Sequence, residues 1–378
     1  MRFSLTVWNS YNELSSDFLY VTEDINGLSF STLLPGGFGA CSFSLATNYS
    51  TTVKWYREYI GKHLVLFDTY GRRVYEGRIA SVNMDDTGVS VEVEGYYAHA
   101  WDLTHGLIYP VTTPTTSSDV IIDTVNLSTE WQHEDFGITP TLIDITPLDF
   151  TGEAKLGDAI DEVLKYGSSD LVPRPLHFAI WDKRIPYLFV EPDDTAQPDW
   201  IILRRMLVNT NGLILNRSRK DIYNKIQILY DDPYIGATFT DWYEDTDSQL
   251  IYGVREGSMN IGQSLADIAD LVGQLAIRSY AYPKQSATVG VRGKISKLLG
   301  SEEYLYMVRA GQTVRFNDMD PTVSQLLMGN NGAQYQTQFI YQTTFKADTN
   351  ELELDLNRRN ISLDLMMARL GMSTGSIK

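Results

Sequence analysis

Short runs in which apolar and polar residues alternate recur through the first 105 residues of the chain. Residues 3–8, 41–46 and 89–94 each follow this two-residue period. Because successive side chains of a strand point to opposite faces of a sheet, the period predicts strands with one buried face. Two further runs, 63–67 and 74–79, flank a short loop that contains glycine, which predicts a hairpin. We therefore expect residues 1–105 to form a meander of short strands.

A cluster of glycines, Gly36, Gly37 and Gly39, precedes the second of these runs. A phosphate-binding loop would need Lys followed by Ser or Thr downstream, and a dinucleotide site would need a helix after the glycines. Neither follows here. We interpret the cluster as a turn in which backbone segments approach closely.

The composition changes between residues 109 and 147, where Thr, Ser and Pro are frequent, and this change predicts a domain boundary. Helices are expected at 119–125 and, from an apolar stripe, at 155–166. A second hairpin is expected from the runs 178–181 and 187–190, which flank the polar residues 182–184. Residues 106–200 are thus predicted to mix helices and strands.

Strand patterns return at 201 and are interrupted by an acidic loop, 240–248, and by the helical pattern 264–279. They resume at 304, 314–316, 338–344 and 352–356. A short helix or docking segment is suggested at 363–370. Two strand-rich blocks therefore bracket two mixed segments, and the fold class is predicted to be α+β, predominantly β, with two small sheet or barrel domains.

Charge and cysteine content exclude several classes of protein. The 378 residues contain 31 Lys and Arg against 48 Asp and Glu, a net charge of −17, whereas a general nucleic-acid binder needs the opposite sign. The single cysteine, Cys41, excludes an internal disulfide and a multi-cysteine metal site. No apolar run has the length of a signal peptide or reaches the ~18 residues of a membrane span, so we expect no membrane insertion.

The residue types that usually carry catalysis are not arranged for it. The five histidines, at 63, 99, 105, 133 and 177, lack metal-ligand spacing, although His99 and His105 are close enough in sequence to approach one another. Cys41 lies in a strand-like run and is expected to be a buried structural thiol. No Gly-x-Ser-x-Gly elbow occurs. No catalytic, cofactor-binding or metal-binding residue is predicted, and no cofactor.

Carboxylates offer the main alternative to this interpretation. Glycosidase-like pairs were considered at Glu191 with Asp193, Asp231 with Asp232, and Asp241 with Glu244, but all lie in polar segments where solvated acidity is the usual state. Asp241, Asp245 and Asp247 lack the glycine and terminal glutamate of an EF-hand loop. The 7 Trp and 23 Tyr could form a carbohydrate-binding surface, but packing within sheets or contacts between subunits are the favoured roles.

The order of several phrases resembles a known family. These are 36–43, 61–68 with 71–79, 89–96, 221–226 and 308–315. The chain resembles a bacteriophage tail hub protein, meaning the baseplate hub or the amino-terminal structural region of tail-associated proteins of long-tailed phages. The resemblance implies a homotrimer in which two β-barrel tube domains per subunit imitate a six-fold ring. It would place the first tube domain at 1–105 and the second at 201–232 with 305–357.

The same resemblance implies a mixed α/β peripheral domain at 106–200 and an inserted domain with a helix at 233–304. From the pattern of the last residues, 358–378 are predicted to be a C-terminal docking segment. The resemblance also implies a non-enzymatic hub at the distal end of the tail in the virion. Its partners would be the tail tube and distal tail proteins and the tip, spike or fibre proteins, and genomic DNA would pass without specific binding. The alternatives are a carbohydrate-binding or cell-wall-degrading tail component and a six-fold distal tail adaptor.

Overall fold

The structure is a computed structural model of the chain. It describes residues 2–133, 137–168, 174–192, 196–208, 213–218, 222–282, 284–298, 300–317 and 337–356. Within these ranges no helix combines the length and the apolar character needed to cross a membrane. The helix or docking segment expected at 363–370 lies outside the described residues.

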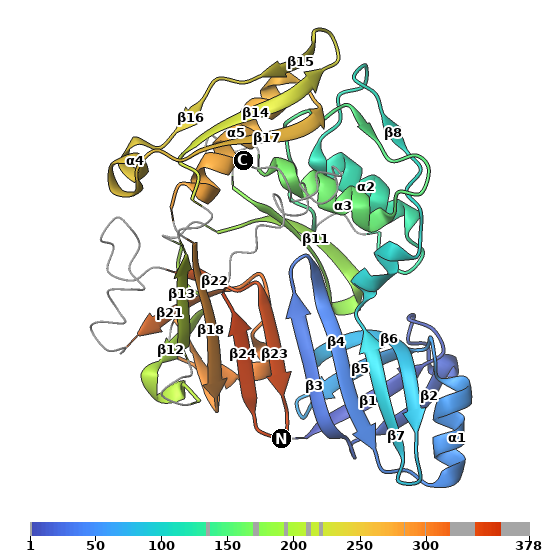
Figure 1. The fold of residues 1–378 in the computed structure, drawn as a ribbon. Coiled ribbons are helices and arrows are strands. Elements are labelled where there is room, and N and C mark those ends of the chain that lie inside the picture. The colour runs from blue at the N-terminus through green and yellow to red at the C-terminus, as the bar shows by residue number, and fades with distance from the viewer. Residues whose placement is uncertain are drawn as a thin grey trace.

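One 13-stranded sheet runs through both strand-rich blocks of the sequence. Figure 1 shows its amino-terminal strands as a strongly curved sheet beside the strands of the second block. Along its main path the strands follow one another in the order β13 (Leu213–Ser218), β18 (Lys284–Arg292), β24 (Glu351–Asp355), β23 (Gln342–Lys346), β3 (Asn26–Leu33), β4 (Gly36–Leu45), β7 (Val89–Glu94), β6 (Arg73–Met84), β5 (His63–Asp68), β1 (Phe3–Trp8) and β2 (Phe18–Thr22).

The fold class is confirmed as α+β and predominantly β, whereas the expectation of two β-barrels is not confirmed. None of the sheets formed by the described residues closes on itself. A strand has two edges for pairing, and β3 uses one edge for β4 and the other for β23. The edge through which the first block would close is therefore occupied by the second block. The result is one open sheet shared by both.

Local patterns in the first block were predicted correctly. The expected hairpin is β5–β6, and the run at 89–94 is β7, which pairs with both β6 and β4. The sequence analysis missed the helix α1 (Tyr49–Glu58). Asn48 caps this helix by accepting a hydrogen bond from the Thr51 backbone N–H at 3.0 Å, and Trp55 on the helix is fully buried.

The second block adds a five-stranded sheet to the long one. Its order is β20 (Glu302–Tyr304), β19 (Lys294–Lys297), β12 (Trp200–Leu203), β21 (Thr313–Asn317) and β22 (Gln338–Phe339), with β12 and β21 parallel. Apolar residues of both sheets and of the first block, such as Phe30, Val289 and Val314, belong to one continuous core. The two strand-rich blocks are therefore packed as a single body.

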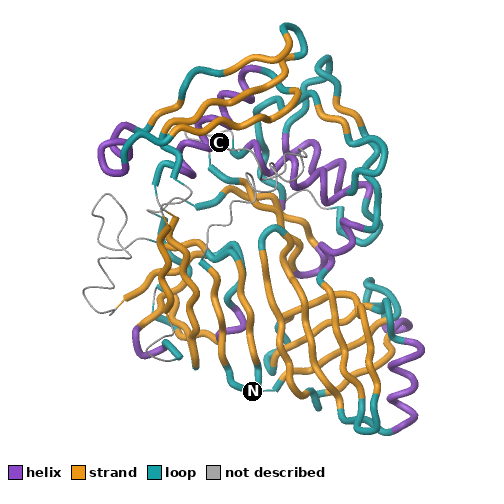
Figure 2. The backbone as a smooth tube through the Cα atoms, in the orientation of Figure 1, coloured by secondary structure: helices purple, strands orange, loops and turns teal. Residues whose placement is uncertain are grey.

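The mixed units lie at the other end of the molecule, where Figure 2 shows most of the helical turns. One unit contains β8 (Ile108–Tyr109), α2 (Ser117–Leu127), β9 (Leu148–Asp149), α3 (Leu156–Val163), β10 (Leu176–Trp181) and β11 (Ile185–Val190). The other contains β14 (Lys225–Asp232), β15 (Gly236–Phe239), β16 (Tyr243–Glu244), α4 (Thr246–Tyr252), β17 (Glu256–Gln263) and α5 (Ala266–Tyr280). Both units contribute to a second shared core.

The helices expected at 119–125, 155–166 and 264–279 are confirmed as α2, α3 with the 3-10 turn Leu164–Tyr166, and α5. The hairpin expected at 178–190 is β10–β11. Other short 3-10 helices lie at Ser15–Asp17, Tyr96–Trp101, Asp182–Arg184, Arg204–Met206 and Leu305–Met307. The sequence analysis did not predict α4, which lies in the acidic loop region.

Strand pairing differs from the expected partition in two places. β14, placed by sequence in the second tube domain, pairs with β15, β16 and β17, because its apolar side chains pack in the core that contains α5. β18 and β19, placed by sequence in the inserted domain, pair with β24 and β12 instead. The second strand-rich block thus gains these two strands and lacks β14. The other expected boundaries stay predictions.

The glycine cluster at 36–39 has the role that the sequence analysis gave it. β10 pairs in parallel with the start of β4, with Ile180 opposite Gly37. Gly37 has a φ of +95°, and a Cβ there would lie 2.1 Å from the Ile180 carbonyl oxygen. Only glycine fits this close approach, which attaches the β10–β11 hairpin to the long sheet.

Candidate functional site

The long sheet has one apolar face and one polar face, and the polar face is the candidate functional site. On β3, Leu28 and Phe30 are buried while Ser29 and Ser31 face away from the core. The same alternation holds on β4, β7, β18, β23 and β24, and on β6 the buried Val82 lies between the outward Ser81 and Asn83. We call the outward set the polar sheet face, and it comprises Thr288, Arg292, Glu351, Glu353, Asp355, Gln342, Thr344, Lys346, Ser29, Ser31, Ala40, Ser42, Ser44, Ser90, Glu92, Glu94, Ser81 and Asn83.

Strand register makes this face continuous across the junction of the two blocks. Thr344 of β23 lies opposite Ser31 of β3, and Lys346 lies opposite Ser29. Ser29 in turn lies opposite Ser42 of β4, which lies opposite Glu92 of β7. A row of outward side chains therefore passes from the second block into the first without a change of face.

The polar sheet face is acidic and carries mainly small side chains. Its charged members are three carboxylates on β24 and two on β7, against Arg292 and Lys346. Glu92 accepts a hydrogen bond from Ser81 Oγ at 2.8 Å. Glu351 binds Arg292, and this hydrogen bond lowers the pKa of Glu351. Such a surface is polar and negative at neutral pH.

The long sheet ends in strands that are paired on one side only. β2 pairs with β1, and β13 pairs with β18; these are the two ends of the path that the described strands form. On β2 the side chains of Phe18 and Val21 are 43% and 54% exposed. Unpaired strand edges with apolar side chains are templates for pairing with another chain.

Each histidine has its own partner, and the structure does not assemble the five into one site. His63 Nε2 lies 3.1 Å from Glu13 Oε1, and His177 Nε2 lies 3.0 Å from Glu191 Oε2. The partner of His99 is Asp102, that of His105 is Thr124, and that of His133 is Asn126. Burial lowers the pKa of His105.

A buried ionic network surrounds His63 and was not predicted, because its members are distant in sequence. Ligand atoms of Glu13, His63 and Glu76 lie within 4.8 Å of one another, which is the spacing of a potential metal site. Arg73, however, donates to both carboxylates, to Glu13 at 2.8 Å. The positive charge between the carboxylates is thus supplied by the chain itself, and the donor set does not favour a second cation.

The pKa shifts in this network follow from burial and from Arg73. Burial raises the pKa of Glu76, and the charge of Arg73 offsets only part of that effect. Burial acts on Glu13 in the same direction, but the hydrogen bond from His63 and the charge of Arg73 outweigh it and lower the pKa of Glu13. The network therefore holds the loop before β2 against β5 and β6.

The described carboxylates of the candidate glycosidase pairs have roles in the local fold. Glu191 is buried and accepts hydrogen bonds from Tyr341 OH at 2.8 Å and from His177, while Asp193 lies outside the described residues. Asp232 accepts from the backbone N–H of Tyr234 at 2.8 Å, in the turn after β14. Asp231 belongs to β14 itself. Asp231 and Asp232 are consecutive residues of one strand and do not face one another across a cleft in the way that glycosidase carboxylates do.

The acidic loop that was weighed as a calcium site also serves the local fold. Asp245 caps α4 by accepting from the Ser248 backbone N–H at 2.8 Å. Glu244 forms an ion pair with Lys225 at 3.5 Å. Asp241 and Asp247 precede and follow these two residues.

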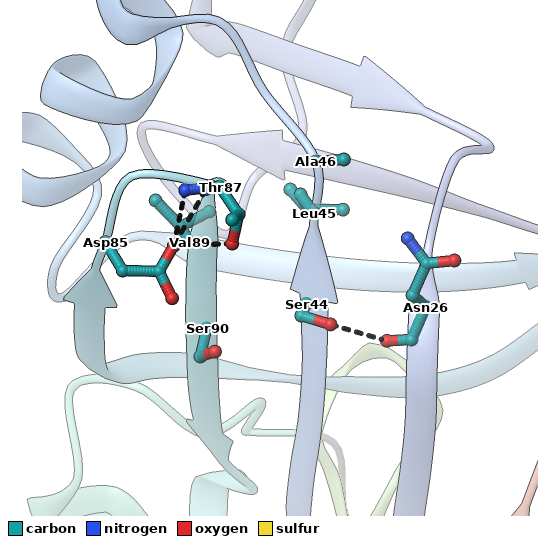
Figure 3. A pocket seen from close by; sticks show the side chains of 9 residues that line it. Asn26, Ser44, Leu45, Ala46, Asp85, Thr87, Val89 and Ser90 are labelled. Atoms are coloured by element: carbon teal, nitrogen blue, oxygen red, sulfur yellow. Dashed lines mark hydrogen bonds between the residues drawn. The ribbon is translucent and has the colours of Figure 1, made fainter.

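Cys41 and a shallow pocket complete the survey of candidate chemistry. Cys41 is buried on β4, and burial raises the pKa of its thiol far above the ordinary value, which confirms the structural interpretation. The pocket lies at one end of the polar sheet face, between Asn26 and the β6–β7 turn (Figure 3). There Asp85 accepts hydrogen bonds from Thr87 and from the Gly88 backbone, which lower its pKa and close the turn.

Comparison with solved structures relates this architecture to known proteins. The tail protein from Neisseria meningitidis MC58 matches with a TM-score of 0.62 and 11% identity, over 95% of this chain and 96% of its own. The 43 kDa tail protein of prophage MuSo2 from Shewanella oneidensis matches with a TM-score of 0.61 and 12% identity, over 96% and 100%. The chain has the fold of phage tail proteins.

A third phage tail-protein structure supports the same conclusion. The prophage tail protein gp18 from Listeria monocytogenes EGD-e has a TM-score of 0.60 and 14% identity, and 98% of each chain is covered. The tail-protein fold thus extends over both strand-rich blocks and both mixed units, and the resemblance seen in the sequence is confirmed at the level of fold. No protein-family model and no curated protein sequence matches the chain.

Proposed function

We propose that the chain is a non-enzymatic structural protein of a phage tail, a hub subunit that assembles as a homotrimer into a ring around a channel. In this proposal the two strand-rich blocks of each subunit present their polar sheet face to the axis. Three copies then offer six blocks, which adapts a six-fold tail tube to a three-fold tip.

The observation that carries the proposal is the continuity of the polar sheet face across both blocks. If the two blocks were separate domains, each subunit would need an additional interface to hold them together. Here β23 and β3 already join the blocks through five register pairs, from Lys346–Ser29 to Gln342–Leu33. The sheet edges at β2 and β13 remain for contacts between copies, which supports ring closure as the way to cover them.

The charge of the face suits a channel through which DNA moves without binding. Carboxylates at Glu92, Glu94 and Glu353 repel phosphates, and the serines among them give the surface small, polar side chains. The overall charge of −17 has the same sign. We propose the distal end of the virion tail as the location, with tail tube, distal tail, and tip, spike or fibre proteins as the partners.

Assembly of the purified chain tests this proposal. Native mass spectrometry and electron microscopy are expected to give three copies around an open axis. Val21→Lys on the β2 edge should abolish the ring, because it would place a charge in the contact between β2 and the next copy. Leu142→Lys, at a side chain that is 83% exposed away from both edges, is the matched control and should assemble normally. A persistent monomer at high concentration, or equal behaviour of the two variants, would refute the proposal.

The alternatives predict different outcomes of the same preparation. A six-fold distal adaptor would give six copies around the axis. A carbohydrate-degrading component would release products from cell-wall glycans, and that activity would be lost in a carboxylate-to-amide variant. No contact among the described residues favours either alternative over the hub.

A further inference from the structure

Seven exposed apolar side chains lie within a short stretch of the second mixed unit. Leu250, Tyr234 and Ile235 are 86%, 76% and 74% exposed. Large apolar side chains gathered on an exposed surface are typical of an interaction site. We call this set the apolar strip, and it consists of Tyr234, Ile235, Phe239, Trp242, Leu250, Ile251 and Val254.

The apolar strip follows one edge of the four-stranded sheet. β15 and β16 both pair with the same strand, β14, and Thr240 connects them by hydrogen bonds to Ile228. α4 follows directly after β16 (Figure 1). The buried side chains of β14, such as Ile226 and Ile228, pack in the core with α5, so the strip is separate from that core.

Acidic residues are interspersed in sequence with those of the apolar strip. Segment 231–256 contains seven carboxylates, at 231, 232, 241, 244, 245, 247 and 256, and one cation, Arg255, which gives a net charge of −6. Lys225 adds a neighbouring cation that is already held by Glu244 and by Glu256 at 3.0 Å. The chemistry that fits this surface is therefore apolar with basic residues around it.

Residues 357–378 of this chain have that chemistry. They contain Arg358, Arg359, Arg369 and Lys378 against the single acid Asp364, a net charge of +3. Their larger apolar residues are Ile361, Leu363, Leu365, Met366, Met367, Leu370, Met372 and Ile377. An acidic, apolar surface and a basic, apolar segment thus occur in one chain.

The path of the chain brings the two together. At the end of β24 the Leu356 backbone N–H donates to the Ala287 carbonyl at 2.9 Å. α4 and its cap residue Asp245 contact the chain a few residues before Ala287. Ser248 Oγ donates to the Ala281 carbonyl, and Tyr282 OH donates to Asp245 at 3.2 Å. The six residues from Ala281 to Ala287 span at most ~20 Å when extended, so residue 357 starts within about that distance of α4. Fully extended, residues 357–378 reach ~70 Å.

We propose that residues 357–378 dock on the apolar strip of their own chain. Apolar side chains of the segment cover Leu250, Ile251 and their neighbours, and its arginines face the carboxylates of segment 231–256. The docked segment keeps this edge of the sheet from pairing with other chains. The inference concerns a single copy and holds whether or not the tail-hub role is correct.

Site-directed cross-linking in the full chain tests this proposal. Leu250→Cys provides one accessible thiol, because Cys41 is buried, and a maleimide–diazirine reagent is attached there. Irradiation of a dilute mixture of ¹⁴N and ¹⁵N chains, followed by peptide mass spectrometry, should give cross-links mainly to residues 357–378 of the same isotope. Leu142→Cys with the same reagent is the control and should give none to that segment.

A second variant shows whether the contact is specific. Leu365→Ser combined with Leu370→Ser should reduce the cross-link yield about tenfold, since two apolar side chains no longer become buried. An unchanged melting temperature will show that the fold is intact. Cross-links between isotopes would replace the proposal with a contact between two copies. Cross-links to other parts of the chain, or equal yields from positions 250 and 142, would overturn it.

Discussion

The two strand-rich blocks use similar strands but are assembled differently. In the first block β5, β6 and β7 follow one another in the sequence and pair with their neighbours through short turns. In the second block β12 pairs with β21 across more than a hundred residues, and β23 pairs with β3 of the first block. Pairing through short turns therefore predominates in the first block, whereas the second block combines the hairpins β19–β20 and β23–β24 with pairings over long sequence distances.

This difference shows where the stability of the molecule should be concentrated. The second block has few local pairings of its own, so it depends on the core that it shares with the first. Phe345 of β23 packs at this junction, with its ring centroid 5.4 Å from that of Phe30 and 5.8 Å from that of Tyr306. If the comparison is correct, damage at the junction will affect both blocks together.

The largest expected effect is that of Phe345→Ala. The side chain is 1% exposed, and its loss should lower the free energy of unfolding by about 3–5 kcal/mol. Chemical denaturation followed by fluorescence and circular dichroism will measure it. Phe239→Ala, at a side chain that is 54% exposed, is the control and should cost far less. Loss of only the second block, seen as two separated transitions, would show that the blocks are independent.

Arg73→Met should be next in size, because it leaves the buried carboxylate of Glu76 without its ion-pair partner. We expect a loss of about 3 kcal/mol at neutral pH. Without Arg73 the pKa of Glu76 rises further, so the deficit should shrink as the pH falls and Glu76 becomes protonated. Arg73→Met combined with Glu76→Gln should recover part of the stability. A deficit that is independent of pH would contradict this account of the first block.

Asp68→Asn tests a polar contact between the two blocks. Asp68 accepts hydrogen bonds from Arg72 Nε at 2.7 Å and from Tyr306 OH at 3.0 Å. Burial alone would raise the pKa of Asp68, but the hydrogen bonds from the backbone and side chain of Arg72 and from Tyr306 outweigh it and lower the pKa of Asp68 from its ordinary value. We expect the substitution to cost about 1.5–3 kcal/mol at neutral pH.

The pH dependence of this cost has a definite sign. A carboxylate whose pKa is lowered in the folded state stabilises the protein above its unfolded pKa, and that contribution is lost as the pH falls through the folded pKa. The difference between wild type and Asp68→Asn, measured by urea denaturation, should therefore be constant near neutrality and shrink below pH ~4. A difference that grows in acid would contradict the assignment.

The smallest expected effect is that of Thr344→Val on the polar sheet face. Thr344 is half-buried and lies opposite Ser31 at the junction, on the side away from the core. Substitutions at such surface positions usually change stability by less than about 0.5 kcal/mol. Thermal unfolding will measure this. Thr343→Val is the matched comparison, because its buried hydroxyl is hydrogen-bonded to Thr32 at 2.7 Å, and it should cost more.

The same contrast explains what the sequence predicted. The two-residue period identified β7 and the face that it buries, and the glycine-containing loop identified the hairpin β5–β6, because this information is local. The pairing of β23 with β3 was not predicted, since period and turn chemistry say nothing about a partner 300 residues away. The buried network of Glu13, His63, Arg73 and Glu76 was missed for the same reason. For α1, the signal was available in Asn48 as a helix cap.

The candidate site was predictable in character but not in place. The acidic composition suggested a surface that repels DNA, and the alternation showed that each strand has a polar side. Only the register of β24, β23, β3, β4 and β7 shows that these sides form one continuous face. The family resemblance suggested two tube domains, and this division stays a prediction; the described strands of both blocks belong to one sheet.

A reconstruction of the assembled chain by electron cryomicroscopy tests the central claim most directly. The account predicts three copies around an open axis, with Ser42, Glu92 and Thr344 facing the opening and β2 of one copy near β13 of the next. Six copies, a closed centre, or a polar sheet face turned to the outside of the ring would contradict it.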